Sequence, residues 1–187
     1  AGALVFPGGR VDPEDHALAA DAAHSPPQGS DVAMTALGVA AVRETFEECG
    51  VLLARARGEQ ALVDAGRLRT IEAAHRAAMM RAQRSFGEIL AAEDLALAAD
   101  ALVPFALWIS PEGSPKRSDT HFFLAWAPSD QVALHDGQEA VDSLWIAPAA
   151  ALERADAGVY RMAFPTRMNL QKLARHHSVA AAIEAAR

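Results

Sequence analysis

The chain has 187 residues, enough for one domain with a sizeable core, and 51% apolar with 22% charged residues is typical of a folded globule. Lysine and arginine total 17 against 24 aspartates and glutamates, a net charge of −7, so we expect neither nucleic acid nor an anionic membrane as a partner. The single cysteine excludes an internal disulfide framework and fits a reducing, cytoplasmic compartment.

The first part of the chain predicts a strand, a loop and a long helix. Residues 3–6 are an apolar run that Pro-Gly-Gly ends, as in a strand that enters a tight turn. Pro-Pro and Gly-Ser pairs prevent a continuous helix over 12–31, where we expect a loop with about one helical turn. A proline-free helix is predicted over 34–49, ended by Gly50 as a left-handed residue, and a strand over 51–54.

The middle of the chain predicts helices and then a hairpin. Residues 59–84 favour one long helix or a broken pair, and Ser85 with Glu88 can form a capping box for another. An apolar segment near 103–109 and an aromatic one at 120–126, with a turn-like stretch between them, predict a β-hairpin.

The last part predicts a strand and two helical regions. We expect a strand at 143–146, a helix from Pro148 to about residue 155, and a helical region that Thr166 caps and that breaks near Ser178. No repeat and no clear domain linker is visible, so the fold class expected is α/β with one core.

Three carboxylates share one face of the predicted helix at 34–49. At about 100° per residue, Glu44, Glu47 and Glu48 lie opposite the apolar side chains of Val39, Val42 and Phe46. Neighbouring charges at this spacing repel by about 3 kcal/mol per pair at an effective dielectric constant of about 20. A hard divalent cation, Mg²⁺ or Mn²⁺, would offset that repulsion, because such cations prefer carboxylate oxygen. The alternative is an acidic face that water solvates.

The residues around these carboxylates resemble the box that defines the Nudix hydrolases. Residues 43–51, Arg-Glu-Thr-Phe-Glu-Glu-Cys-Gly-Val, match its second half at every fixed position except Thr45, where the family has a larger aliphatic residue. Counting from Gly8 puts Glu14 at the acidic position of the first half. From there to Arg43 is 29 positions in place of the usual 8, an insertion of 21 residues.

An insertion at this place looks like one branch of the family, the peroxisomal coenzyme A diphosphatase-like proteins and their bacterial relatives. Weaker similarities run over most of the chain: the Phe-Pro-Gly-Gly segment, Ser-Asp-Thr-His-Phe-Phe at 118–123, Trp-Ile-Ser-Pro at 108–111 and Pro-Thr at 165–166. The resemblance implies an α/β/α sandwich around a mixed sheet, with extra helices between box and hairpin.

The domain organisation expected from this resemblance is a single Nudix domain over 1–187. Residues 12–36 would form an insertion loop within the box, and residues 59–100 a helical insert. Because the sequence begins almost at the Phe-Pro-Gly-Gly segment, we expect one or more first strands of the family sheet to be missing. The unpaired sheet edge could then form a homodimer.

The resemblance also implies roles for the box glutamates. Glu47 and Glu48 match the two metal-binding positions, and Glu44 the position that acts as a further ligand or as the base in different members. Glu139 resembles a late acidic position that adds a ligand or base from a separate loop, with an ordinary loop residue as the alternative.

Other box positions are implied to be structural. Gly8 and Gly9 match the tight turn close to phosphate, and Gly50 the box glycine that follows the helix. Arg43 matches the residue that orients the box carboxylates through an ion pair. Its partner would be Glu14 or Asp15.

Several further side chains have a functional and a structural interpretation. Lys116 and Arg117 could meet an extra phosphate of the substrate, although loop cations are usually just solvated. Cys49 beside acidic residues favours a structural role over a nucleophile. For the aromatic side chains we expect core packing and not base stacking: Trp108, Phe122, Phe123 and Trp126.

The activity implied is Mg²⁺- or Mn²⁺-dependent hydrolysis of a nucleoside diphosphate linked to another group. Coenzyme A or an acyl-coenzyme A is the best single substrate, giving adenosine 3',5'-bisphosphate and a 4'-phosphopantetheine compound. ADP-ribose or a dinucleotide is the alternative. So is a protein that binds a nucleotide without hydrolysing it, which the three retained helical glutamates disfavour.

Overall fold

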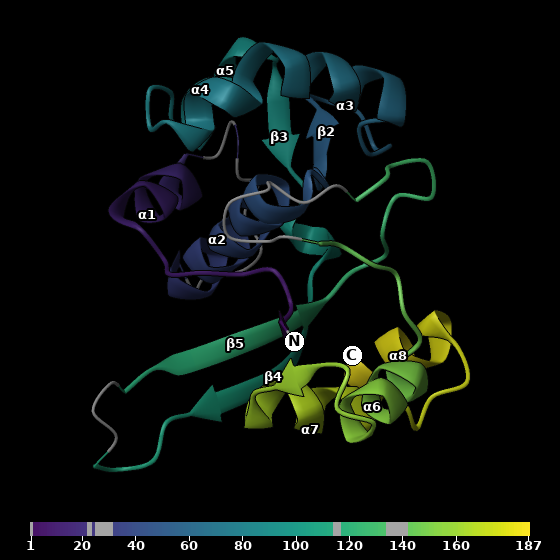
Figure 1. Ribbon diagram of the computed structural model, residues 1–187. Coiled ribbons are helices and arrows are strands. Elements are labelled where there is room, and N and C mark those ends of the chain that lie inside the picture. The colour runs from purple at the N-terminus through teal and green to yellow at the C-terminus, as the bar shows by residue number, and fades with distance from the viewer. Residues whose placement is uncertain (1, 22–23, 25–31, 114–116, 134–141) are drawn as a thin grey trace. The chain divides into compact units, whose positions relative to one another are not determined.

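The computed structural model describes residues 2–21, 24, 32–113, 117–133 and 142–187 (Figure 1). It divides into two compact units. We call Pro7–Leu102 with Ala127–Ser143 the helical unit, and Ala1–Phe6 with Val103–Trp126 and Leu144–Arg187 the hairpin unit.

The helical unit is built around α2, Val32–Cys49, which ends where Gly50 adopts a φ of +66°. Before it comes α1, Pro13–Ala20. After it come β2, Ala54–Ala56, α3, Ala65–Ile71, a π-helical segment, Glu72–Arg76, and α4, Ala77–Met80. The unit continues with α5, Phe86–Ala92, β3, Leu95–Leu97, and a 3₁₀ turn, Ala99–Ala101.

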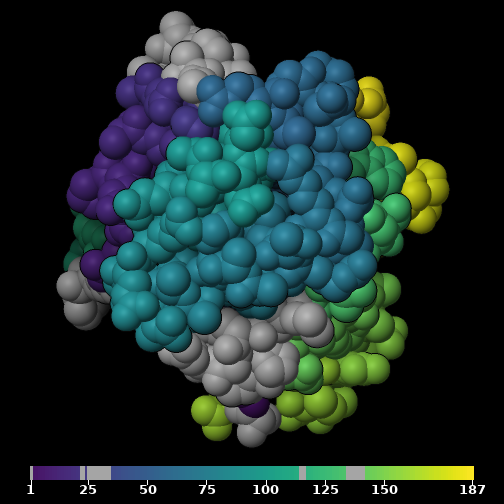
Figure 2. Space-filling view, turned by 90° about the horizontal axis from the view of Figure 1, so that it is seen from above, coloured from purple at the N-terminus to yellow at the C-terminus, as the bar shows by residue number. Residues whose placement is uncertain are grey.

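The apolar face of α2 forms the core of this unit. Val39, Val42 and Phe46 are fully buried, and the rings of Phe46 and Phe86 lie 6.0 Å apart. Burying a side chain of this size stabilises a fold by about 1.5 to 3 kcal/mol. β2 and β3 pair antiparallel, with Ala54 opposite Leu97. In the space-filling view the blue and teal segments of α3, α4 and α5 form one continuous surface (Figure 2).

The hairpin unit contains two strand pairs and three helices. β4, Val103–Ile109, and β5, Asp119–Leu124, are antiparallel with an irregular register between Pro104 and Ala106. β1, Ala3–Leu4, pairs in parallel with β6, Arg161–Met162. The helices are α6, Pro148–Asp156, α7, Phe164–Leu173, and α8, Val179–Ala186.

Most predicted elements are present, including the helix at 34–49, the capping box of Ser85 with Glu88, the hairpin and the break near Ser178. The loop predicted over 12–31 contains α1, two helical turns where one was expected, because Pro13 and the Asp12 capping box start it. The helix predicted from residue 59 begins at Ala65, where Asp64 caps it.

Three predictions of local structure are wrong. Residues 51–53 are not a strand, which begins only at Ala54. Residues 143–146 are not a strand either, and Trp145 is 69% exposed. Thr166 does not cap α7, because Ala163 is the N-cap. The helix begins at Phe164, two residues before Thr166, with Pro165 in its first turn.

Candidate active site

The turn before α1 lies against the carboxylate face of α2. The backbone N–H of Gly8 donates to Oε2 of Glu48 at 3.2 Å. A Cβ placed on Gly9 would overlap the carboxylate of Glu44, so a larger residue there would displace that side chain. The two glycines thus bring a backbone without side chains next to Glu44 and Glu48.

Arg43 joins α1 to this face. Its Nε and Nη2 donate to the two carboxylate oxygens of Asp15 at 2.9 and 3.0 Å, a two-point ion pair. Its Nη1 donates to Oε1 of Glu44 at 2.9 Å and to Oε2 of Glu47 at 3.1 Å. Of the two partners that sequence left open, Asp15 is the one that Arg43 contacts, and Glu14 is exposed.

Asp15 is fixed by the start of its own helix. It is 1% exposed, and its Oδ2 accepts the backbone N–H of Asp12 at 2.8 Å. Arg43 Nη2 also donates to the backbone oxygen of Arg10 at 2.9 Å. Arg10 and Asp12 were not singled out from the sequence. The match of Gly-Gly-Arg-Val-Asp to the start of the box was the available signal.

Burial and charge act on the ionisation of these groups. Burial raises the pKa of Glu44, assisted by the charges of Asp12 and Asp15, although Arg43 lowers it. Burial also raises the pKa of Glu47, and so does the charge of Glu44, while Arg43 opposes both. For Arg43, burial lowers the pKa, but the hydrogen bond and charge of Asp15 with the charges of Glu47 and Glu44 more than offset it, so its pKa is raised.

The donor set suits a hard divalent cation in chemistry, since it consists of carboxylate oxygens. In the described part of the chain, no group of three or more His, Cys, Asp or Glu side chains is arranged to hold a metal. Arg43 draws Glu44 and Glu47 toward itself, and Glu48 accepts from Gly8. A cation bound here would compete with Arg43 for these oxygens, and its charge would oppose the burial and the carboxylate repulsion that raise the two pKa values.

Among the remaining candidates that the structure describes, it links neither Arg117 nor the aromatic side chains to this face by a hydrogen bond or an ion pair. Lys116 and Glu139 lie outside the described residues. Arg117 is exposed beside β5 in the hairpin unit, and Cys49 is half-buried at the end of α2. Trp108, Phe122 and Phe123 are half-buried, but Trp126 is 54% exposed, so core packing is wrong for Trp126, which follows the end of β5.

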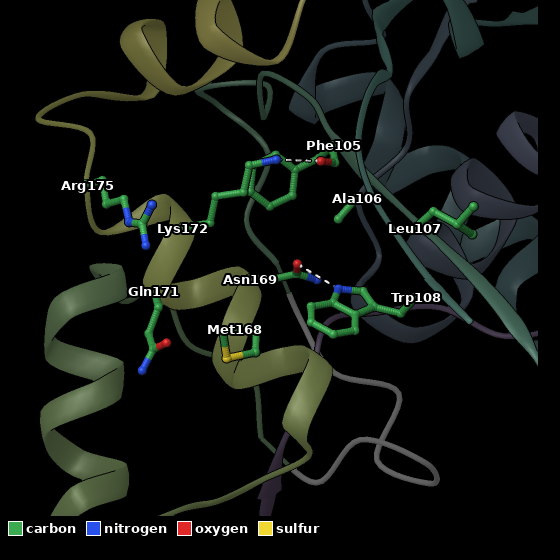
Figure 3. A pocket seen from close by; sticks show the side chains of 9 residues that line it. All are labelled: Phe105, Ala106, Leu107, Trp108, Met168, Asn169, Gln171, Lys172 and Arg175. Atoms are coloured by element: carbon green, nitrogen blue, oxygen red, sulfur yellow. Dashed lines mark hydrogen bonds between the residues drawn. The ribbon is translucent and has the colours of Figure 1, made fainter. Parts of the chain in front are cut away.

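A groove of about 360 Å³ lies in the hairpin unit between β4 and α7 (Figure 3). The Trp108 indole N–H donates to Oδ1 of Asn169 at 3.0 Å, and Lys172 Nζ donates to the backbone oxygen of Phe105 at 2.8 Å. Among the described residues Nδ2 of Asn169 has no hydrogen-bond partner. Sequence reasoning missed this groove, since none of its helical residues belongs to a recognisable motif.

The fold and the carboxylate helix define the class: the chain belongs to the Nudix hydrolases. Residues 19–173 match the family model described as the NUDT19 Nudix domain, so it is a member of that branch. It is similar to a Caenorhabditis elegans protein named "Putative nudix hydrolase 7", 27% identical over 172 residues, 92% of this chain and 50% of the relative. The chain thus spans about half the length of the curated relative that it matches.

A solved structure agrees with this assignment. The crystal structure of a NUDIX hydrolase from Alicyclobacillus acidocaldarius matches 98% of this chain and 81% of its own, with a TM-score of 0.75 and 29% sequence identity. The mixed α/β Nudix fold predicted from the sequence is therefore confirmed. Within the described residues no helix is long and apolar enough to cross a membrane.

Proposed function

We propose that the chain hydrolyses a nucleoside diphosphate linked to another group, with coenzyme A or an acyl-coenzyme A as the substrate. The observation that carries the proposal is the Arg43 ion pair with Asp15, which fixes a face where Glu44, Glu47 and Glu48 meet the Gly8 turn. The substrate class follows from membership of the NUDT19 branch.

In this proposal Glu44, Glu47 and Glu48 hold Mg²⁺ or Mn²⁺. When bound, the cation would lower the pKa of a water molecule and neutralise charge on the phosphate oxygens. The backbone at Gly8 leaves room for the diphosphate beside the helix, because a Cβ placed there would point into open space.

The protein's own acid–base chemistry would come from a glutamate. Water attacks one phosphorus, the bond from that phosphorus to the bridging oxygen breaks, and a carboxylate accepts the proton that the water loses. Glu44, whose box position acts as a further ligand or as the base in different family members, is the first candidate for this role, and Glu47 is the second. Glu139 is the third candidate for this role.

Phosphorus NMR of the purified protein with coenzyme A and millimolar Mg²⁺ tests the proposal. We expect the diphosphate signals to become monophosphate signals with the unaltered chain and not with Glu47→Gln, Glu48→Gln. Glu14→Gln is the matched control, because Glu14 is exposed and makes no contact with Arg43.

The alternatives have separate outcomes in the same experiment. Conversion of ADP-ribose or a dinucleotide, with coenzyme A unchanged, would keep the hydrolase and replace the substrate. Binding of these nucleotides without conversion would replace the enzyme with a nucleotide-binding protein. The α/β/α sandwich, the single domain over 1–187, a homodimer and a cytoplasmic location also stay proposals.

A further inference from the structure

We propose that Arg76 is a positioning residue, which holds the last turn of α2 so that Glu47 and Glu48 can bind a divalent cation. The inference rests on the proposed function, because it assigns a second arginine to the same carboxylate face. Arg76 lies outside the box and had no role in the sequence analysis.

The contact is made to the backbone of the helix end. Nη2 of Arg76 donates to the carbonyl oxygen of Glu47 at 3.2 Å. The last four carbonyls of a helix lack an intrahelical donor, and a cation beside them is favoured by the helix dipole. Gly50 N–H serves the oxygen of Phe46 at 2.9 Å, and Arg76 serves the next oxygen along. Arg76 therefore restrains the turn that carries both predicted ligands.

Glu72 and Gly50 make this contact a tight fit. Oε1 of Glu72 accepts from Nη1 of Arg76 at 3.0 Å, so the guanidinium is held from both sides. A Cβ on Gly50 would lie 2.6 Å from that oxygen and 3.1 Å from Nη1. The box glycine thus lets the arginine approach the helix end, besides allowing the positive φ.

The π-helical segment presents Arg76 in this direction. One wider turn at Glu72–Arg76 adds a residue to the helical run and rotates the side chains that follow it. His75 anchors the segment on another side: its Nδ1 faces Nη1 of Arg84 at 2.7 Å, and its Nε2 lies 2.6 Å from Oε1 of Glu93. Because arginine only donates, Nδ1 accepts and Nε2–H donates to Glu93. The π turn is therefore held in place by two partly buried hydrogen bonds of His75.

The direct test is Mn²⁺ binding to metal-free protein, measured by electron paramagnetic resonance without substrate. We expect Arg76→Ala to weaken binding about tenfold, and Arg76→Lys, which keeps the charge but not the two-point geometry, to weaken it less. Arg69→Ala is the matched control, since Arg69 is an exposed arginine earlier in the same helical run. It should bind Mn²⁺ like the unaltered chain.

A second measurement reports on the helix end itself. Amide hydrogen exchange at Gly50 should quicken in Arg76→Ala and stay unchanged in Arg69→Ala, because only the former loses the restraint on the last turn. Unchanged Mn²⁺ affinity in folded Arg76→Ala overturns the inference. If that variant does not fold, unchanged affinity in Arg76→Lys does so. Absence of Mn²⁺ binding to the unaltered chain would instead overturn the metal-dependent function proposed above.

Discussion

Arg43 is the residue on which the candidate site depends. It carries one positive charge among the carboxylates of Asp15, Glu44 and Glu47, and it donates a hydrogen bond to each of them at 2.9 to 3.1 Å. A buried pair of this kind is costly to break, because removing one partner leaves a desolvated charge. The carboxylates outnumber the single guanidinium charge of Arg43. The remaining negative charge favours the binding of a cation.

Replacing Asp15 tests the buried pair. Asp15→Ala should lower the free energy of unfolding by about 3 kcal/mol, because the buried Arg43 loses its two-point partner and the Asp12 N–H loses its acceptor. Glu14→Ala, in the same helical turn but exposed, should change it by less than about 0.5 kcal/mol. Urea unfolding of the two variants measures the difference. Equal losses would show that the pair contributes nothing specific.

The raised pKa values predict how stability depends on pH. The folded protein holds protons on Glu44 and Glu47 that the unfolded chain releases near the ordinary glutamate pKa of 4.5. Stability of the metal-free protein should therefore fall as pH rises from 4.5 through the raised pKa values. Glu47→Gln should flatten this slope in thermal unfolding curves taken from pH 4.5 to 7. A slope equal to that of the unaltered protein would contradict a pKa of Glu47 raised by its half-buried position.

The sequence predicts the carboxylates of the candidate site but not all the residues that contact them or Arg43. The spacing of Glu44, Glu47 and Glu48 follows from the box, whereas the choice between Glu14 and Asp15 depends on how α1 is turned. Asp15 occupies the third position of a capped helix inside the insertion, and that helix was not expected to be so long. Arg76 could not be predicted, because a π turn leaves no clear mark in a run of Ala, Glu and Arg.

At the scale of elements, periodicity predicted α2 and the hairpin well, while short apolar runs misled. The run at 51–54 has the composition of a strand. At Leu52, however, the backbone N–H and carbonyl are hydrogen-bonded by the side chain of Gln131 and not by a neighbouring strand. Gln131 accepts from Leu52 N–H at 3.0 Å and donates to the oxygens of Leu52 at 3.2 Å and Val63 at 2.7 Å. Gln131 lies 79 positions from Leu52 along the chain, so no local sequence pattern predicts this contact.

Gln131 should therefore stabilise the helical unit strongly. Gln131→Ala leaves one buried N–H and two buried carbonyls without their partner, and we expect a loss of about 3 kcal/mol in unfolding free energy. Gln60→Ala is the comparison, because the side chain of Gln60 is exposed and only its backbone oxygen is bonded, to Arg55. Chemical denaturation of both variants measures the two unfolding free energies. A change below about 1 kcal/mol for Gln131→Ala would mean that water replaces the amide.

At the scale of the whole molecule, the described strands form three separate pairs distributed over two units. The family resemblance implies a single domain around one mixed sheet, which stays a proposal, because hydrophobic patterning marks strands but not which strands pair. The box itself falls entirely within the helical unit, from the glycine turn to Gly50. The metal chemistry proposed for the chain is thus assigned to one unit.

Metal binding should therefore stabilise the protein through the helical unit. At a free Mn²⁺ concentration 100 times the dissociation constant, linkage adds about 2.7 kcal/mol, seen as a higher melting temperature than in a chelator. Hydrogen exchange should slow in peptides from α2 more than in those from β4 and β5, because the glutamates belong to the former. Glu47→Gln, Glu48→Gln should abolish both effects. Equal slowing in both units would mean that Mn²⁺ does not bind at the carboxylate face of α2. It would also contradict the roles that we assign to Arg43 and Arg76 at that face.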